Sequence, residues 1–188
     1  YRARLEGYES EVQFFDGIED ALEICLDRGF RLGLVTTKLS GAARRHLQSV
    51  GALDKFKCIV AGDMVTKLKP DPEPFLLAME TMQTDSASCF TVGDSPGDII
   101  GAHAAGIQTI AAEWGCLDTA RLRACSPHHF ITRLTDISSL SATGFQEMRP
   151  VSTLDDASKG DGITAINRAD SASVKRCSFS VRAGISNA

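Results

Sequence analysis

Between Gly17 and Leu140, the sequence alternates short apolar runs rich in β-branched residues with segments that repeat apolar residues at helical spacing. This alternation is typical of parallel strands joined by helical crossovers, because both faces of such a sheet must be covered. The sequence therefore predicts an α/β fold with a doubly wound parallel sheet. Residues 141–188 lack any sustained period of 2 or 3.6 and are predicted to form a disordered tail.

Glycines, prolines and apolar periodicity divide the alternating region into elements. Strands are predicted at residues 30–35, 58–61, 89–92, 109–111 and 129–131. Helices are predicted at 18–28, 41–50, from Pro74 onward, at 99–105 and near 136–140. In the helix that Pro74 opens, we expect the core-facing residues to be Phe75, Leu76, Met79 and Met82.

Composition excludes several classes of function. A formal net charge of −4 and a pI near 5.6 give no basic surface of the kind that binds nucleic acid or an anionic membrane. No apolar run approaches the roughly 20 residues of a spanning helix, so we expect a soluble cytoplasmic protein. The 6 cysteines include no Cys-x-x-Cys pair and are expected to be buried, reduced thiols rather than zinc ligands.

Polar side chains follow three of the predicted strands. Thr36 ends the strand that begins at Phe30, Lys69 lies in the proline-containing loop after the strand at 58–61, and Asp94 and Asp98 follow the strand at 89–92. In an open parallel sheet, groups at the carboxyl ends of strands converge on one crevice. A hydroxyl, an ammonium and two carboxylates at one edge suit phosphoryl transfer, which depends on placing the phosphate and neutralising its oxygens.

The chemistry of each group suggests its role. Asp94 and Asp98 offer hard oxygen ligands of the kind that Mg²⁺ prefers, with a third carboxylate needed from elsewhere. Lys69 can place a positive charge beside phosphate, and Thr36 can donate a hydrogen bond to a phosphate oxygen. Taken singly, each residue is equally consistent with a turn, a cap or a solvated loop charge. The ordered set at successive strand ends carries the functional interpretation.

These segments resemble the second, third and fourth motifs of the haloacid dehalogenase superfamily. The resembling stretches are 34–38 (LVTTK), 69–74 (KPDPEP) and 92–99 (VGDSPGDI), and the resemblance extends over residues 17–140. Residues 59–63 (IVAGD), 104–110 (AAGIQTI) and Trp114-Gly115 are similar to the phosphoglycolate phosphatase and pyrophosphatase branch.

The resemblance implies functions for individual residues. Thr36 would be the phosphate-binding hydroxyl, Lys69 the charge that steadies the intermediate, and Asp94 and Asp98 the magnesium-side acids. Thr37, where relatives often have asparagine, would contact substrate. The implied reaction is Mg²⁺-dependent hydrolysis of a small phosphorylated metabolite through an aspartyl-phosphate, with 2-phosphoglycolate as the leading substrate. The alternatives are a pyrophosphatase, a phosphosugar mutase, or an inactive truncated paralogue that binds phosphate or a partner.

The family's first motif is an apolar strand ending in Asp-x-Asp, and no segment of this sequence has that form. Phe14-Phe15-Asp16-Gly17 lacks the second acid, so residues 1–16 are expected to be the end of a helical cap and its linker. The resemblance implies that the missing strand would lie in the middle of the sheet. We therefore expect a core without its central first strand, inactive for want of the nucleophile.

Overall fold

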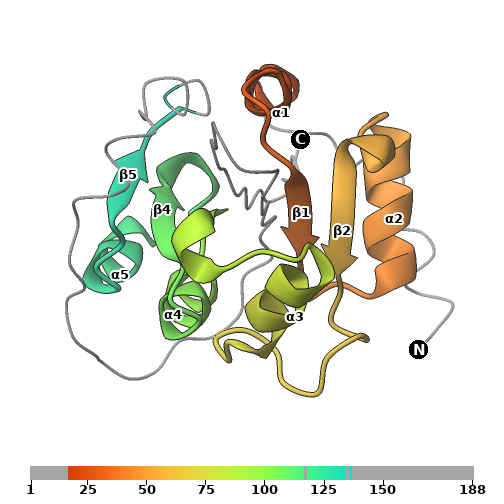
Figure 1. Ribbon diagram of the computed structural model, residues 1–188. Helices are drawn as coiled ribbons and strands as arrows, with labels where there is room; N and C mark the ends of the chain where they lie inside the picture. The colour runs from red at the N-terminus through yellow and green to blue at the C-terminus, as the bar shows by residue number, and fades with distance from the viewer. Residues whose placement is uncertain (1–16, 117, 134–135, 137–188) are drawn as a thin grey trace, which may run out of the picture.

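A computed structural model describes residues 17–116, 118–133 and 136 (Figure 1). The longer helices are α1 (Ile18–Asp27), α2 (Ser40–Ser49), α3 (Glu73–Thr81), α4 (Pro96–Ala104) and α5 (Thr119–Ala124). The strands are β1 (Leu32–Val35), β2 (Phe56–Val60), β3 (Phe90–Gly93), β4 (Gln108–Ala112) and β5 (His129–Ile131). Single 3₁₀ turns occur at Leu53–Lys55, Ser86–Ser88 and Glu113–Gly115.

All of the described strand pairs are parallel, which confirms the predicted α/β class. β1 pairs with β2, while β3, β4 and β5 form a second sheet in that order. Among the residues that the structure describes, no strand pairs with both β1 and β3. The expectation of a missing central strand concerns this position and stays a prediction.

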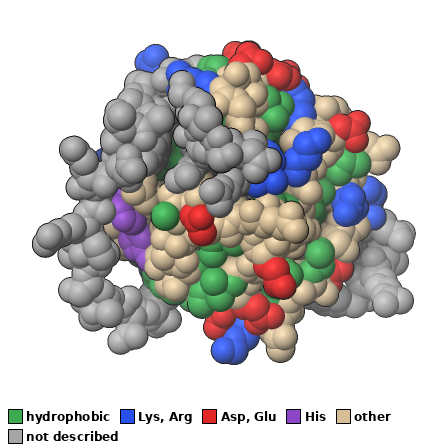
Figure 2. Space-filling view, viewed as in Figure 1, with side chains coloured by type: hydrophobic (Ala, Val, Ile, Leu, Met, Phe, Trp, Pro, Cys, Tyr) green, Lys and Arg blue, Asp and Glu red, His purple; other side chains and the backbone are tan. Residues whose placement is uncertain are grey.

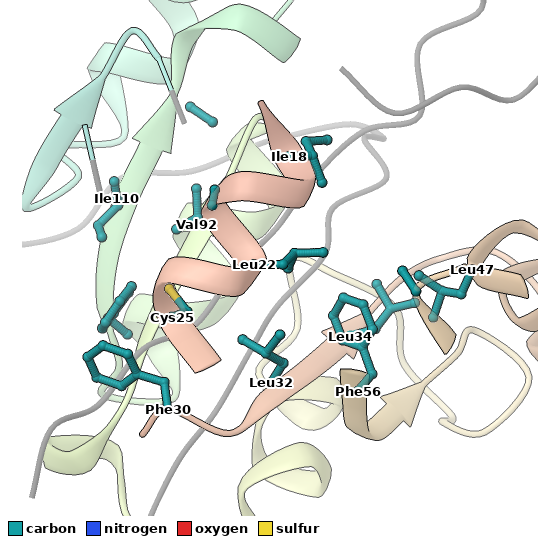
Figure 3. Close-up of a cluster of buried hydrophobic side chains, with 14 of the residues drawn as sticks. Ile18, Leu22, Cys25, Phe30, Leu32, Leu34, Leu47, Phe56, Val92 and Ile110 are labelled. Atoms are coloured by element: carbon teal, nitrogen blue, oxygen red, sulfur yellow. The ribbon is translucent and has the colours of Figure 1, made fainter. Parts of the chain in front are cut away.

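Helices cover both faces of the strands, because apolar side chains alternate between two cores. Leu32 and Leu34 of β1 pack in one cluster with α1 and α2, whereas Val35 packs in another with α3 and α4. In Figure 3, α1 lies between the two sheets, with Val92 and Ile110 on one side of it and Leu32 and Leu34 on the other. The buried face of α1 therefore belongs to one apolar cluster that includes strands of both sheets.

Local sequence signals account for several element boundaries. Gly29 has φ +77° and follows α1, a left-handed backbone that a residue with a Cβ rarely adopts. Ser95 caps α4 and forms a capping box with Asp98, and Pro96 occupies the first turn. None of the helices in the described ranges is long and apolar enough to cross a membrane.

The structure corrects some details of the sequence predictions. Leu76 does not face the core but is 48% exposed, because it lies on the solvent side of α3 while Phe75, Met79 and Met82 are buried. α4 begins at Pro96 rather than Ile99, since its cap precedes the apolar stripe. α5 was not predicted, because its polar sequence contains one buried side chain, Leu122. The predicted cap segment at 1–16, the tail at 141–188 and the closing helix beyond residue 136 lie outside the described residues.

Three of the predicted reduced cysteines are buried, namely Cys25, Cys58 and Cys89. Cys116 and Cys125 are free thiols as well, but they are only half-buried. Burial raises the pKa of both, and nearby Asp94 contributes to the rise at Cys116. These thiols are therefore protonated at neutral pH and serve as apolar packing. Cys177 lies outside the described residues.

Candidate active site

Lys69 and Asp98 form a buried ion pair at the carboxyl edge of the strands. Lys69 Nζ donates to Asp98 Oδ1 at 2.5 Å, and the two side chains are only 2% and 0% exposed. The ammonium also donates to the carbonyl oxygen of Val35, the last residue of β1, at 3.1 Å. A buried ion pair persists only when further polar groups satisfy its remaining bonding capacity, and the Val35 carbonyl supplies one such group.

Asp98 is held on its other side by the start of its own helix. The Ser95 hydroxyl and backbone N–H donate to Asp98 Oδ2 at 2.7 and 3.2 Å, and the Asp98 N–H donates to Ser95 Oγ at 3.4 Å. Both carboxylate oxygens of Asp98 are thus bonded to protein groups. The same side chain caps α4 and fixes the direction of the Lys69 ammonium.

The chain folds so closely here that a side chain does not fit at residue 93, where a Cβ would collide with the Cβ of Asp98. A Cβ on Gly97 would lie 3.6 Å from the Lys69 Cβ, which is ordinary packing contact. The Gly-Asp-Ser-Pro-Gly-Asp sequence therefore places α4 directly against the loop that carries Lys69. The Lys69-Pro70 peptide bond in that loop is cis.

Thr36 is buried and follows Val35, whose carbonyl binds Lys69. Its backbone N–H donates to the Val60 carbonyl at 2.9 Å, which extends the β1–β2 ladder by one residue. Its Oγ1 accepts a hydrogen bond from the Lys38 N–H at 3.2 Å, so the hydroxyl proton is directed elsewhere. Thr37 is half-buried.

Asp94 follows β3 and is 4% exposed, with both of its carboxylate oxygens buried. Thr36 and Asp94 follow the last residues of β1 and β3, Lys69 lies in the loop after β2, and Asp98 lies in the first turn of α4. Hydrogen bonds join Lys69 to Asp98 and to Val35, the residue before Thr36. Whether these residues act on phosphate stays a prediction.

Mg²⁺ is bound through oxygen ligands, which Asp94 and Asp98 could supply. Asp94 is a buried hard-oxygen donor of the required type, whereas Asp98 is committed to Lys69 and Ser95. Within the described ranges, no group of three or more His, Cys, Asp or Glu side chains could hold a metal ion. Asp94 thus fits as one ligand, and Mg²⁺ generally completes its shell with waters and substrate.

A second polar cluster lies at the opposite, amino end of the strands. His103 Nε2 is 2.7 Å from Thr109 Oγ1 and 3.3 Å from His128 Nδ1, and the Thr109 N–H donates to His128 Nδ1 at 3.1 Å. Figure 2 shows histidine side chains grouped on this part of the surface. Burial lowers the pKa of His103 to about 4, so both rings are neutral at pH 7.

The Gly62-Asp63 turn was singled out in the sequence only as part of a resemblance, yet it contacts the Thr36 loop. Asp63 accepts hydrogen bonds from Ser40 N–H and Ser40 Oγ at 2.8 and 2.7 Å. The Gly62 N–H donates to the Lys38 carbonyl at 2.9 Å. The sequence feature that could have indicated this contact is the Gly-Asp pair between the strand and the loop that carries Lys69.

Taken together, the fold and the site define a parallel α/β protein with a buried lysine, two acids and a hydroxyl at the carboxyl edge. Residues 1–112 match the family model described as haloacid dehalogenase-like hydrolase, and this chain belongs to that family.

Similar proteins carry phosphatase and pyrophosphatase names. Pyrophosphatase PpaX of Oceanobacillus iheyensis is 31% identical over 138 residues, covering 73% of this chain and 64% of that protein. The probable phosphatase IndB of Dickeya dadantii is 31% identical over 123 residues, covering 65% and 54% respectively. The chain therefore spans less than two thirds of the length of these relatives.

Solved structures show the same fold. A predicted phosphoglycolate phosphatase from Haemophilus somnus superposes with a TM-score of 0.68 at 22% identity, covering 73% of this chain and 62% of that one. A haloacid dehalogenase phosphatase from Thermococcus onnurineus gives 0.63 at 27% identity, covering 74% and 63%. The doubly wound core predicted from the sequence is thus the fold of this family.

Proposed function

We propose that this chain forms the phosphate-binding half of a magnesium-dependent phosphomonoester hydrolase. The observation that carries the proposal is the buried Lys69–Asp98 pair, which is bonded to the residue before Thr36. Asp94, four residues before Asp98 in the chain, is a second buried acid. A buried ammonium held at fixed geometry can stabilise charge on a phosphate oxygen without reorganising. The Thr36 hydroxyl, whose oxygen already accepts from Lys38, donates its proton to a second oxygen.

Charge balance supports the divalent ion. Lys69 is paired with Asp98, and Asp94 adds a second acid to the proposed site, so its two acids exceed its one lysine by one negative charge. A phosphate dianion would be repelled by that charge at short range. Mg²⁺, when bound, supplies positive charge that neutralises the phosphate oxygens, and Asp94 is the described residue that would hold it.

The reaction also needs a nucleophilic aspartate, which the family places in its first motif. The sequence of residues 1–188 contains no apolar run that ends in Asp-x-Asp. We therefore expect these residues by themselves to bind phosphate without turnover, and the whole protein to form an aspartyl-phosphate. A substrate such as 2-phosphoglycolate fits this proposal. Pyrophosphate is the second candidate, because relatives at 31% identity are named pyrophosphatases.

The test is the affinity for inorganic phosphate, measured by titration calorimetry with and without Mg²⁺. Removing a charged hydrogen-bond donor by Lys69→Met should weaken phosphate binding about 10- to 100-fold. The matched control is Lys67→Met in the same loop, because the Lys67 side chain is 70% exposed and pairs only with Asp71 there. Lys67→Met should leave the affinity unchanged.

Thr36→Val gives a second route in case Lys69→Met fails to fold. Threonine and valine have nearly the same shape, so the change removes the hydroxyl and should weaken phosphate binding about 5- to 10-fold. The proposal would be wrong if all three variants and the unaltered chain had equal phosphate affinity. It would also be wrong if Mg²⁺ did not change the phosphate affinity of the unaltered chain.

A further inference from the structure

The loops that carry Thr36 and Lys69 are fastened together at one point. Residues 36–39 connect β1 to α2, and residues 61–72 connect β2 to α3. Asp63, near the start of the second loop, accepts two hydrogen bonds from Ser40, the first residue of α2, at 2.8 and 2.7 Å. The Gly62 N–H donates to the Lys38 carbonyl at 2.9 Å.

The fit between these loops is too close for a side chain at residue 62. A Cβ on Gly62 would lie 2.5 Å from the Thr37 carbonyl oxygen and 3.1 Å from the Leu68 side chain. Glycine therefore lets the second loop pass directly against the backbone of Thr37. The position of this backbone determines where the neighbouring Thr36 hydroxyl lies.

The far end of the second loop is fixed as well. Glu73, the first residue of α3, accepts from the Thr66 and Lys67 N–H groups at 2.7 and 2.9 Å. Lys69 follows these two residues in the loop and is itself held by its ion pair with Asp98. Asp63 is thus the part of the loop that bonds to the Thr36 side, while Glu73 and Asp98 hold the Lys69 side.

We propose that Asp63 is a positioning residue, which sets the separation of the Thr36 hydroxyl and the Lys69 ammonium by clamping Ser40. The inference rests on the proposed phosphate-binding function and assigns that site a residue outside its phosphate contacts. A phosphate ion is bonded well only when both donors stand at hydrogen-bond distance from it, and an error near 1 Å can cost about 100-fold in a reaction. The Ser40 bonds lower the pKa of Asp63, so its carboxylate is charged at neutral pH and accepts both bonds.

The experiment compares inorganic phosphate affinity in Asp63→Ala, Asp63→Asn and Ser40→Ala with the unaltered chain, in the presence of Mg²⁺. Asp63→Ala should weaken phosphate binding about tenfold. The phosphate affinity of Asp63→Asn should lie between those of Asp63→Ala and the unaltered chain, because the amide oxygen still accepts one hydrogen bond. Combining Asp63→Ala with Ser40→Ala should weaken binding no further than Asp63→Ala alone.

Global stability separates positioning from a merely structural contribution. Asp63 is exposed, so the urea midpoint of Asp63→Ala should stay that of the unaltered chain, while hydrogen exchange at the amides of residues 37–40 speeds up. The matched control is Glu23→Gln. It removes the charge of an exposed side chain on α1 that pairs with Lys55, outside both of these loops. Its phosphate affinity should not change.

Three results would overturn the clamp. Unchanged phosphate affinity in Asp63→Ala, while Lys69→Met loses binding, would leave the proposed function intact and remove Asp63 from it. A fall in affinity matched by an equal loss of urea resistance would make Asp63 a structural residue only. If the unaltered chain binds no phosphate, the proposed function fails and the positioning inference falls with it.

Discussion

Replacing Asp98 with asparagine should destabilise the fold far more than the same change at an exposed aspartate nearby. Asparagine keeps the size of the side chain but removes its charge, so the Lys69 ammonium would remain buried with only the Val35 carbonyl as a partner. Breaking a buried pair at one partner costs about 3–5 kcal/mol. The amide oxygen of the new residue can still accept from Ser95, so the helix cap is largely retained.

The control is Asp71→Asn, which removes the charge that pairs with Lys67 in the loop that also carries Lys69. That pair is 3.3 Å apart, and its side chains are 70% and 29% exposed. Surface pairs contribute about 0–1 kcal/mol, so Asp71→Asn should lower the free energy of unfolding by less than about 1 kcal/mol. The two pairs contain the same residue types, and the Lys69–Asp98 pair is the buried and shorter of the two.

Urea unfolding followed by circular dichroism, and by fluorescence of the single tryptophan, measures both variants. Trp114 packs against the main apolar cluster and reports its opening. A domain has a free energy of unfolding of about 5–15 kcal/mol, so the loss in Asp98→Asn would be a large fraction of it. Losses of similar size in both variants, or less than about 1 kcal/mol in Asp98→Asn, would refute the reasoning from burial.

Two further predictions concern packing and pH. Gly93→Ala should lower the free energy of unfolding in urea by about 1–3 kcal/mol, because its methyl group would collide with Asp98. Gly41→Ala, whose methyl group would meet the Arg45 side chain at 3.4 Å, should be neutral or stabilising. Equal effects of the two variants would contradict the packing. The pKa of His103 is lowered to about 4 in the folded chain, so below pH 6.5 the unfolded chain binds more protons than the folded chain. The free energy of unfolding should therefore fall by about 1–2 kcal/mol from pH 6.5 to pH 4, after allowance for the partial exposure of the ring. His103→Gln should reduce this dependence, and an unchanged pH profile would show that His103 is not its source.

Much of the fold was predictable because local signals agree with the tertiary arrangement. Glycines that end helices and the apolar strands placed most elements within a few residues of their observed bounds. The failures arose where packing outweighs periodicity. Leu76 fits an apolar stripe but lies on the exposed side of α3, and α5 forms although Leu122 is its single buried side chain.

The candidate site shows the same division. Residue type and position after predicted strands are enough to single out Thr36, Lys69, Asp94 and Asp98 from the sequence. Their assignment to phosphate and Mg²⁺ stays a prediction. The sequence could not show that Asp98 binds the Lys69 ammonium and caps α4, since that depends on which carboxylate points toward which donor.

By itself, the sequence determined the order of strands and helices, the polar residues at the strand ends and membership of the family. These features follow from local periodicity and residue chemistry, which a linear chain already contains. The tertiary structure alone decided that Lys69 and Asp98 pair in a buried setting and that Asp63 joins the loops of Thr36 and Lys69. Such contacts join residues 23 to 29 positions apart, and only the packing of β1, β2 and α4 brings them within bonding distance.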